Sequence, residues 1–419
     1  YGTIWFNLNR TIRSNVCRSM STLEVNKITP VSGGTTVQVG ESGDTINIPA
    51  GATIANAGTS TGFGDSLRPN VSPLIINGNQ AISQRATSVA SITSSGYHTI
   101  DRLRTNFSGT LGTWTQSQST DVPTGKGFAN SFKMDCTTAD ASPSVADRLS
   151  IRYNFEGQDL QLLKKGTSDA EKITLAFWVK SSKTGVHIVN IVDQDNTRQI
   201  SKSYTVSSSN TWEKVVLNFD GDTTGTLDDD NGQSLYIDFY LGAGTNYTSG
   251  TLATSWEAKN NVNAAVGQVN LADSTSNEWY ITAVQLEVGE YSASNLPPFQ
   301  HESFDNNLER CQRYFFKNNS VANMPMASGV CNGTNNARAV YYFPKTMRAN
   351  PSLDKSSSTD FKIQIGSSVH DTTNVAFYYQ NLNQALLYVD VSSGLTDGKG
   401  CLVIDDGGSN IFISGSAEL

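Results

Sequence analysis

Two tryptophans in polar, loop-like segments are the residues of this sequence best suited to recognition chemistry. Trp114 lies in GTLGTWTQSQ, and Trp256 follows Asn246 and Tyr247 in NYTSGTLATSWEAKNN. An exposed aromatic ring can stack on the apolar C–H face of a sugar, while amide and carboxylate groups bind the sugar hydroxyls. The sequence therefore nominates Trp114, Asn246, Tyr247 and Trp256 as candidate carbohydrate-binding residues. Packing inside the fold is the alternative for the same side chains.

Three further tryptophans are expected in the hydrophobic core. Trp178, Trp212 and Trp279 lie in strand-like runs in which apolar and polar residues alternate. Because such alternation predicts one buried face, we assign these three side chains to core packing.

Five aspartates cluster in the segment FDGDTTGTLDDDNG, at positions 220, 222, 228, 229 and 230. Carboxylate oxygens that lie close together on a turn can hold Ca²⁺, and Asp220, Asp222, Asp228 and Asp230 are the candidate ligands. Their spacing does not match an EF-hand loop. A solvated acidic turn without an ion is therefore the preferred interpretation, and no other cofactor is expected.

The sequence shows no recognisable catalytic constellation. The four histidines form no HxH or HExxH pattern, and there is no GxSxG motif or P-loop. Glycosidases need two carboxylates about 5–10 Å apart, and sequence spacing cannot reveal such a pair in a sheet protein. We therefore predict that the chain is not an enzyme.

Composition and charge limit the classes of partner. The chain has 419 residues, a net charge of −8 and no run of Lys and Arg, so nucleic-acid binding is not expected. No apolar run approaches the length of about 18 residues that a transmembrane helix requires, so membrane insertion is not expected. The odd number of scattered cysteines without a CxxC motif indicates reduced thiols rather than a disulfide framework; they are Cys17, Cys136, Cys311, Cys331 and Cys401.

The first 70 residues differ in pattern from the rest of the chain. Residues 1–19 lack an initiating Met and a secretory apolar core, so Met20 is interpreted as the natural start, with an ordinary N-terminal arm as the alternative. Residues 20–70 contain short alternating segments with too few apolar residues for a monomeric core. We expect a β-rich stem that is stable as an intertwined homotrimer, with a disordered leader as the alternative.

From residue 71 onward the pattern predicts an all-β protein. Alternating and aromatic runs separated by short turns are typical of an antiparallel sandwich or jelly roll, expected over residues 71–300. The expected strands are Leu74–Ile76, Leu149–Asn154, Ile173–Lys180, Val186–Asp193, Gln199–Val206, Glu213–Asn218, Leu235–Leu241 and Trp279–Val288. Residues 301–419 are expected to form one short helix at Asp305–Phe316, capped by Asp305, and a small β-sandwich domain.

Four sets of motifs between Ile76 and Leu419 match a known family in order and spacing. They are INGNQAISQRATS with YHTIDRLR, LAFWVKSS with TWEKVVLNFDGDTTGT, WYITAVQLEVGE with PPFQHESF and LERCQRYF, and FPKTMRANPSL with the terminal SGSAEL. The third set is the strongest and is similar to the family run ITGVQLEVG, TPFE and LxxCQRYY, whereas Leu103 departs from a family Trp. On these motifs the chain resembles phage tail-fibre and virion appendage proteins that join a carbohydrate-binding-module-like jelly roll to a small β domain.

The resemblance implies a structural protein of a phage virion, assembled in the bacterial host cytoplasm. It would be a tail fibre or fibre-like appendage that recognises a glycan on the host surface. Its partners would be two further copies of the chain in a homotrimer, other tail or capsid proteins reached through residues 20–70, and the host glycan. The alternatives are a purely structural capsid or neck decoration or adaptor, and a glycan depolymerase.

Overall fold

The computed structural model describes residues 72–320 and 323–419. These residues belong to one compact unit, residues 65–419. They consist almost entirely of strands and connecting loops, which confirms the all-β expectation. The interpretations of residues 1–19 and of the stem at residues 20–70 lie outside the described residues.

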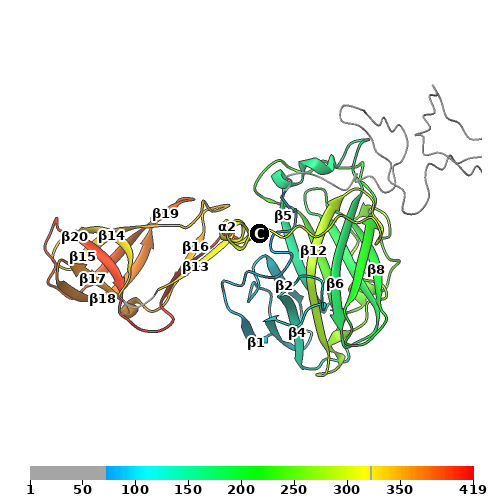
Figure 1. Cartoon of the computed structure of the whole chain (residues 1–419), viewed down its shortest axis with the longest axis horizontal. Helices are drawn as coiled ribbons and strands as arrows, with labels where there is room; N and C mark the ends of the chain where they lie inside the picture. The colour runs from blue at the N-terminus through cyan, green and yellow to red at the C-terminus, as the bar shows by residue number, and fades with distance from the viewer. Residues whose placement is uncertain (1–71, 321–322) are drawn as a thin grey trace, which may run out of the picture. The chain divides into compact units, whose positions relative to one another are not determined.

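Two antiparallel six-stranded sheets pack face to face in a sandwich (Figure 1). The β6 sheet has the order β1-β3-β4-β12-β6-β9, and the β10 sheet has the order β11-β8-β7-β10-β5-β2. The strands are β1 (Ser88–Ile92), β2 (Leu103–Ser108), β3 (Thr113–Ser119), β4 (Ser131–Thr138), β5 (Arg148–Glu156), β6 (Ile173–Ser181), β7 (Gly185–Asp193), β8 (Arg198–Val206), β9 (Glu213–Phe219), β10 (Gln233–Ala243), β11 (Glu257–Ala258) and β12 (Glu278–Val288). The short helices are α1 (Thr245–Thr248) and the 3₁₀ turns Gly157–Asp159, Gln161–Leu163, Asn261–Asn263 and Leu271–Asp273.

The strands expected between Leu149 and Val288 are confirmed to within two residues at each end. The strand expected at Leu74–Ile76 is wrong, because these residues form bends and a turn. β1 to β4 were not expected from the sequence, since polar residues such as those of β3, TWTQSQS, obscure the alternation.

Alternation along the strands decides which tryptophans fill the core. Trp279 of β12 is completely buried, as expected. The core assignment of Trp178 and Trp212 is wrong, because both side chains are only partly buried. Successive residues of a strand point to opposite faces, and Phe177 occupies the inner position of β6, so Trp178 lies on the outer face.

The helix expected after the sandwich is present but shorter and differently capped. α2 covers Phe304–Gln312, and its N-cap is Ser303 rather than Asp305: the Ser303 hydroxyl accepts a hydrogen bond from the Asn306 N–H at 3.3 Å. Phe315 starts the next strand and does not extend the helix. Neither α-helix in the described part of the chain has the length and apolar character needed to cross a membrane.

The C-terminal strands form a closed barrel and a small sheet rather than the expected β-sandwich. β20 pairs with β14 on one side and β17 on the other, which closes the ring β14-β15-β19-β18-β17-β20. A three-stranded sheet, β13-β21-β16, lies between the barrel and α2 in the cartoon (Figure 1). The strands are β13 (Phe315–Asn319), β14 (Pro325–Cys331), β15 (Asn336–Tyr342), β16 (Ser352–Lys355), β17 (Phe361–Ile365), β18 (Ser368–Tyr378), β19 (Gln384–Val391), β20 (Gly400–Asp405) and β21 (Phe412–Ser416), with a 3₁₀ turn at Ser358–Asp360. The cysteines in the described residues, Cys136, Cys311, Cys331 and Cys401, are all buried free thiols.

Motifs far apart in the sequence meet where the sandwich contacts the C-terminus. The Glu418 carboxylate accepts hydrogen bonds from Arg102 at 2.5 Å and from Arg85 at 3.2 Å. The Arg102 guanidinium lies 3.4 Å from the ring centre of Tyr314. All four residues belong to the motifs singled out in the sequence, so part of these motifs holds the chain together rather than binding a ligand.

A buried histidine makes the stability of the sandwich depend on pH. His187 of β7 is completely buried and stacks on Tyr204, with ring centres 5.3 Å apart. Burial lowers the pKa of His187 from 6.5 to about 4, because the interior disfavours the charged imidazolium. Between these two values the unfolded chain binds more protons than the folded one, so stability falls as the pH is lowered from about 6.5 to 4.

We expect His187→Phe to remove about 2 kcal/mol of the stability loss between pH 8 and pH 5, because pH 5 lies about 1.5 units below the ordinary histidine pKa and one unit corresponds to about 1.4 kcal/mol. Urea unfolding of both proteins at pH 8 and pH 5 measures the difference. The expected result is a smaller loss of stability in the variant than in the wild type. Equal losses in the two proteins would show that His187 does not carry the effect.

Candidate functional site

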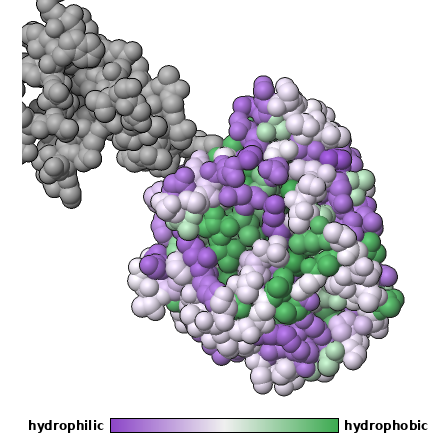
Figure 2. Space-filling view, turned by 90° about the vertical axis from the view of Figure 1, so that its right-hand side faces the viewer, coloured by the Kyte–Doolittle hydropathy of each residue, from purple (hydrophilic) through white to green (hydrophobic). Residues whose placement is uncertain are grey.

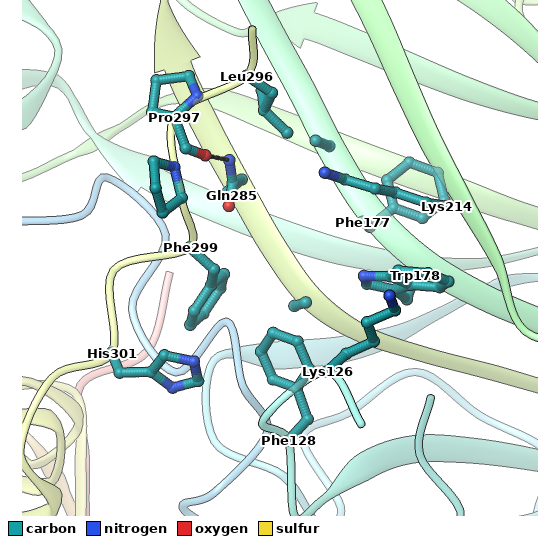
Figure 3. Close-up of a pocket in the computed structure, with 13 residues that line it drawn as sticks. Lys126, Phe128, Phe177, Trp178, Lys214, Gln285, Leu296, Pro297, Phe299 and His301 are labelled. Atoms are coloured by element: carbon teal, nitrogen blue, oxygen red, sulfur yellow. Dashed lines mark hydrogen bonds between the residues drawn. The ribbon is translucent and has the colours of Figure 1, made fainter. Parts of the chain in front are cut away.

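A cleft lies on the outer face of the β6 sheet, the face directed away from the core. Trp178 of β6 pairs with Lys214 of β9. Ala176, two residues earlier on the same face of β6, pairs with Gln285 of β12. These side chains form the floor of a cleft of about 580 Å³, a volume within the range of small-molecule sites (Figure 3).

A β-bulge in β12 shapes this floor. The pairing of β12 with β6 shifts register between Thr282 and Gln285, and Ala283 within the bulge has a φ of +56°. The Val284 N–H donates to the Gly78 carbonyl at 2.9 Å. A Cβ on Gly78 would lie 2.1 Å from the Val284 carbonyl oxygen, so only glycine permits this approach. The turn at residues 77–79, Asn-Gly-Asn, therefore holds the β12 bulge beneath the cleft.

Three aromatic rings form one wall of the cleft. Phe128 lies 5.1 Å from Phe299 and 5.2 Å from His301, measured between ring centres, and Phe299 lies 4.9 Å from His301. The loop that carries the last two rings is tied to the floor, because the Gln285 side-chain N–H donates to the Pro297 carbonyl at 3.1 Å. In Figure 3 this wall faces Trp178 across the cleft.

The opposite side of the cleft carries two lysines. Lys126 stands between Gly125 and Gly127, whose φ values of +73° and +84° form a tight loop that few other residues could adopt. Its ammonium nitrogen lies 5.8 Å from the centre of the Trp178 ring. Lys214 extends from β9 toward Gln285 and Pro297 (Figure 3). Aromatic platforms, an amide and two ammonium groups therefore converge on one open space.

Two acidic residues of this region are paired with basic side chains. Asp121 forms an ion pair with Lys180 and accepts a hydrogen bond from the Trp212 indole N–H at 2.9 Å. Although partial burial opposes the shift, these contacts hold the pKa of Asp121 below its usual value. Glu278 is paired with Lys133 at 2.6 Å. The residues that line the cleft include no Asp or Glu.

Hydrophobic residues are not confined to the cleft. On the side of the sandwich shown in Figure 2, two hydrophobic areas lie on either side of a band of neutral and hydrophilic residues. Exposed apolar surface of this kind is common on proteins. The cleft is therefore distinguished by its convergent polar and aromatic side chains, not by apolar surface alone.

The structure corrects the carbohydrate-binding assignment of Trp114. This side chain is completely buried in the sandwich core, and its indole N–H donates to the Leu111 carbonyl at 2.7 Å. A ligand cannot reach it without unfolding the sandwich. The alternative of core packing is confirmed for this residue.

The other nominated residues do not form one site. Tyr247 of α1 is buried beside Tyr240, whereas Asn246 is exposed. Trp256 is partly buried and donates its indole N–H to the Asp220 carbonyl at 2.7 Å. None of these residues lines the cleft.

The positions of Lys165 and α1 show how far apart these residues lie. Lys165 contacts the Trp256 ring at 5.3 Å and Asp193 at 2.5 Å, and Asp193 pairs with Leu235 near the start of β10. Asn246 follows the end of the same strand, at Ala243. Eight strand residues separate the two ends, which corresponds to about 25 Å. Trp256 and Asn246 therefore cannot contact one small ligand.

In the acidic turn one aspartate is buried against basic side chains and the other candidate ligands are exposed. Asp222 is buried and accepts hydrogen bonds from Arg198 at 2.7 and 3.0 Å, and it also pairs with Lys165 at 3.0 Å. Asp220, Asp228 and Asp230 are exposed. Among the described residues, no group of three or more His, Cys, Asp or Glu side chains is arranged to hold a metal ion. The Lys165 ammonium occupies the position among carboxylates that a bound cation would require.

Sequence reasoning missed the residues of the cleft because it assigned Trp178 to the core and did not consider Phe128, Phe299 or His301. A signal was present at Trp178: in LAFWVK the aromatic residues Phe177 and Trp178 are adjacent, so a strand cannot bury both on one face. No comparable signal marked the loop residues, since their convergence depends on the tertiary fold.

No known family profile and no curated protein matches the sequence. Among solved structures, a tailspike protein 4 enzymatically active domain of bacteriophage CBA120 is 12% identical, with a TM-score of 0.28, and covers 52% of this chain; the chain spans only 21% of that protein. A putative sugar binding protein from Bacteroides thetaiotaomicron is 14% identical, with a TM-score of 0.28, over 52% of this chain and all of its own. A family 11 carbohydrate-binding module of a Clostridium thermocellum cellulase is 12% identical, with a TM-score of 0.23, over 49% of this chain and 98% of its own. Similarity at this level carries no argument about the activity of this chain.

Proposed function

We propose that the cleft on the β6 sheet binds a glycan and that the chain is a recognition protein without catalytic activity. The observation that carries this proposal is the placement of Trp178 opposite the ring wall of Phe128, Phe299 and His301. Sugars present apolar faces and polar edges, and clefts that bind them combine aromatic rings with a few directed polar groups. The cleft has both components.

The polar groups of the cleft suit sugar hydroxyls. Gln285 has its side-chain amide at the floor, where the N–H is already held by Pro297 and the carbonyl oxygen is an acceptor. Lys126 and Lys214 supply donors from the opposite side, and His301 supplies a ring nitrogen. A sugar stacked on Trp178 would therefore meet hydrogen-bonding groups around its edge.

The lining residues support binding without hydrolysis. Glycoside hydrolysis uses a pair of carboxyl groups on the two sides of the scissile bond. The cleft contains no Asp or Glu, and the nearby Asp121 and Glu278 are engaged with Lys180 and Lys133. Failure to release oligosaccharide from any host polysaccharide is the expected result of an activity assay, and release by the purified chain would contradict this part of the proposal.

We further propose that the chain presents this cleft on a tail fibre or fibre-like appendage of a phage virion. The support is the set of shared sequence motifs between Ile76 and Leu419. Weak single-site glycan contacts gain strength when several copies act together, which fits the homotrimer expected from residues 20–70. Light scattering is expected to give three times the 45.2 kDa chain mass. A monomeric mass, or location of the chain inside the capsid by electron microscopy, would contradict this assignment.

Trp178→Ala is the direct test of glycan binding. We expect a loss of affinity of about 30-fold, equivalent to about 2 kcal/mol, since a central aromatic side chain commonly carries this share of binding energy. A glycan array with the full-length chain identifies a ligand, and calorimetry with that ligand measures the affinity of wild type and variant.

Trp256→Ala is the matched control, because Trp256 is also partly buried but does not line the cleft. The control is expected to bind like the wild type, and circular dichroism checks that both variants are folded. Binding lost in Trp256→Ala but kept in Trp178→Ala would overturn the proposed site. A wild-type chain that binds no glycan would favour the purely structural virion role.

A further inference from the structure

The two lysines of the cleft differ from the other lysines on the same sheet face. Lys133 and Lys180 are paired with carboxylates, Glu278 and Asp121 respectively. Lys126 and Lys214 form no ion pair with any residue that the structure describes. The cleft therefore has at its edge two positive charges that no described carboxylate pairs with, whereas Lys133 and Lys180 are each neutralised by a partner.

Lys126 and Lys214 both lie beside Trp178. Lys214 is the direct cross-strand neighbour of Trp178, so its side chain starts from the same row of the sheet. Lys126 approaches the Trp178 ring from the glycine loop, at 5.8 Å from the ring centre. This separation is near the limit of about 6 Å for a cation–π contact, so the contact is weak. An anionic group on a sugar stacked at Trp178 would offer Lys126 a stronger charge-assisted hydrogen bond.

The surrounding structure leaves the side chains of Lys126 and Lys214 free to turn toward an anionic group of a ligand. Lys126 is exposed and flanked by glycines, and its own N–H is held by the Pro123 carbonyl at 3.2 Å, which fixes the loop but not the side chain. Lys214 is exposed as well. No lining carboxylate would repel an anion, because the cleft has none. Neutral sugars would use the aromatic walls and accept hydrogen bonds from the two ammonium groups, but would leave both positive charges without a counter-charge.

We propose that the cleft selects glycans that carry a negatively charged substituent, and that Lys126 and Lys214 bind this substituent while the sugar ring stacks on Trp178. This inference rests on the proposed function, since it names the ligand class of the same cleft. The shared chemistry is an anionic pyranose, and its charge can come from a carboxylate, a phosphate or a sulfate.

The first experiment compares charged glycans with their neutral counterparts. The full-length chain is applied to an array that contains neutral, carboxylated, phosphorylated and sulfated oligosaccharides, and the best ligands are retested after carboxyl reduction, dephosphorylation or desulfation. We expect the best ligands to be anionic and to lose at least tenfold in affinity when the charge is removed. The arm that shows the largest loss identifies the source of the charge.

The second experiment removes the positive charges from the protein. Lys126→Met and Lys214→Met keep an apolar stem and remove the ammonium group. Each is expected to weaken binding of the anionic glycan about tenfold and binding of its neutralised form by a clearly smaller factor, because a neutral sugar loses a hydrogen bond but no charge pair. Lys399→Met is the matched control, since Lys399 is an exposed lysine of the barrel region and does not line the cleft.

The outcomes separate this inference from the proposed function. Equal affinity for the anionic and neutralised glycans, with both lost in Trp178→Ala, would overturn the charge selectivity and leave glycan binding intact. A neutral best ligand, or lysine variants that bind the anionic glycan like the wild type, would also overturn it. If no glycan of either kind binds, the proposed function fails together with the inference.

Discussion

Glu418→Gln is expected to lower the free energy of unfolding by about 3–5 kcal/mol, because it removes the charge that compensates a buried guanidinium. Arg102 has only 1% of its side chain exposed and Glu418 only 5%, with 2.5 Å between the paired atoms. Although burial alone would lower it, the Glu418 carboxylate helps to raise the pKa of Arg102, so the guanidinium stays charged in the variant.

Other contacts of Arg102 do not replace this charge. Its second terminal nitrogen donates to the Asn154 carbonyl at 2.7 Å, and its guanidinium stacks on Tyr314. Both partners are neutral. Arg85, the second cation at Glu418, has only 13% of its side chain exposed and would lose the same partner.

Urea unfolding followed by circular dichroism and tryptophan fluorescence at pH 7 measures the effect. Glu309→Gln is the matched control, since Glu309 is an exposed carboxylate that pairs with Lys345 on the surface. Exposed pairs contribute little to stability, so the control is expected to unfold like the wild type. Equal stabilities of the two variants would show that the Glu418 side-chain carboxylate does not stabilise the fold.

Lys165→Met is expected to have a similar effect, again about 3–5 kcal/mol, because it leaves buried carboxylates without their cation. The Lys165 ammonium lies 2.5 Å from Asp193 and 3.0 Å from Asp222, and all three side chains are at most 4% exposed. It also donates to the carbonyls of Thr224 and Gly225, both at 2.9 Å. One ammonium therefore holds the acidic turn against the end of β7.

The neighbouring lysine provides a control for this variant. Lys164 is exposed and pairs with Glu171 on the surface. Lys164→Met is expected to leave the urea midpoint unchanged, whereas Lys165→Met lowers it. A small effect at Lys165 would mean that Arg198, which also contacts Asp222, compensates for the lost ammonium.

The sequence by itself determined the class of fold and most of the strands of the sandwich. Runs such as Ile173–Lys180 and Trp279–Val288 are rich in β-branched and aromatic residues and alternate in part, and this pattern is a local property that can be recognised without knowledge of the partner strands. Polar strands such as β3 lack the signal, so their pairing became visible only in the sheet. The barrel closure also escaped prediction, because it depends on which strand β20 pairs with on each side.

Only the tertiary structure decided where the candidate site lies. Trp114 lies in a polar sequence segment and yet fills the core. Trp178 lies in an apolar segment and yet faces the cleft. Local composition reports how polar a segment is, but the face that a side chain occupies depends on strand register and on what the opposite sheet covers. The cleft unites β6, β9 and β12 with loops around Lys126 and Phe299. Such convergence arises from long-range packing, which no short segment of the chain encodes alone.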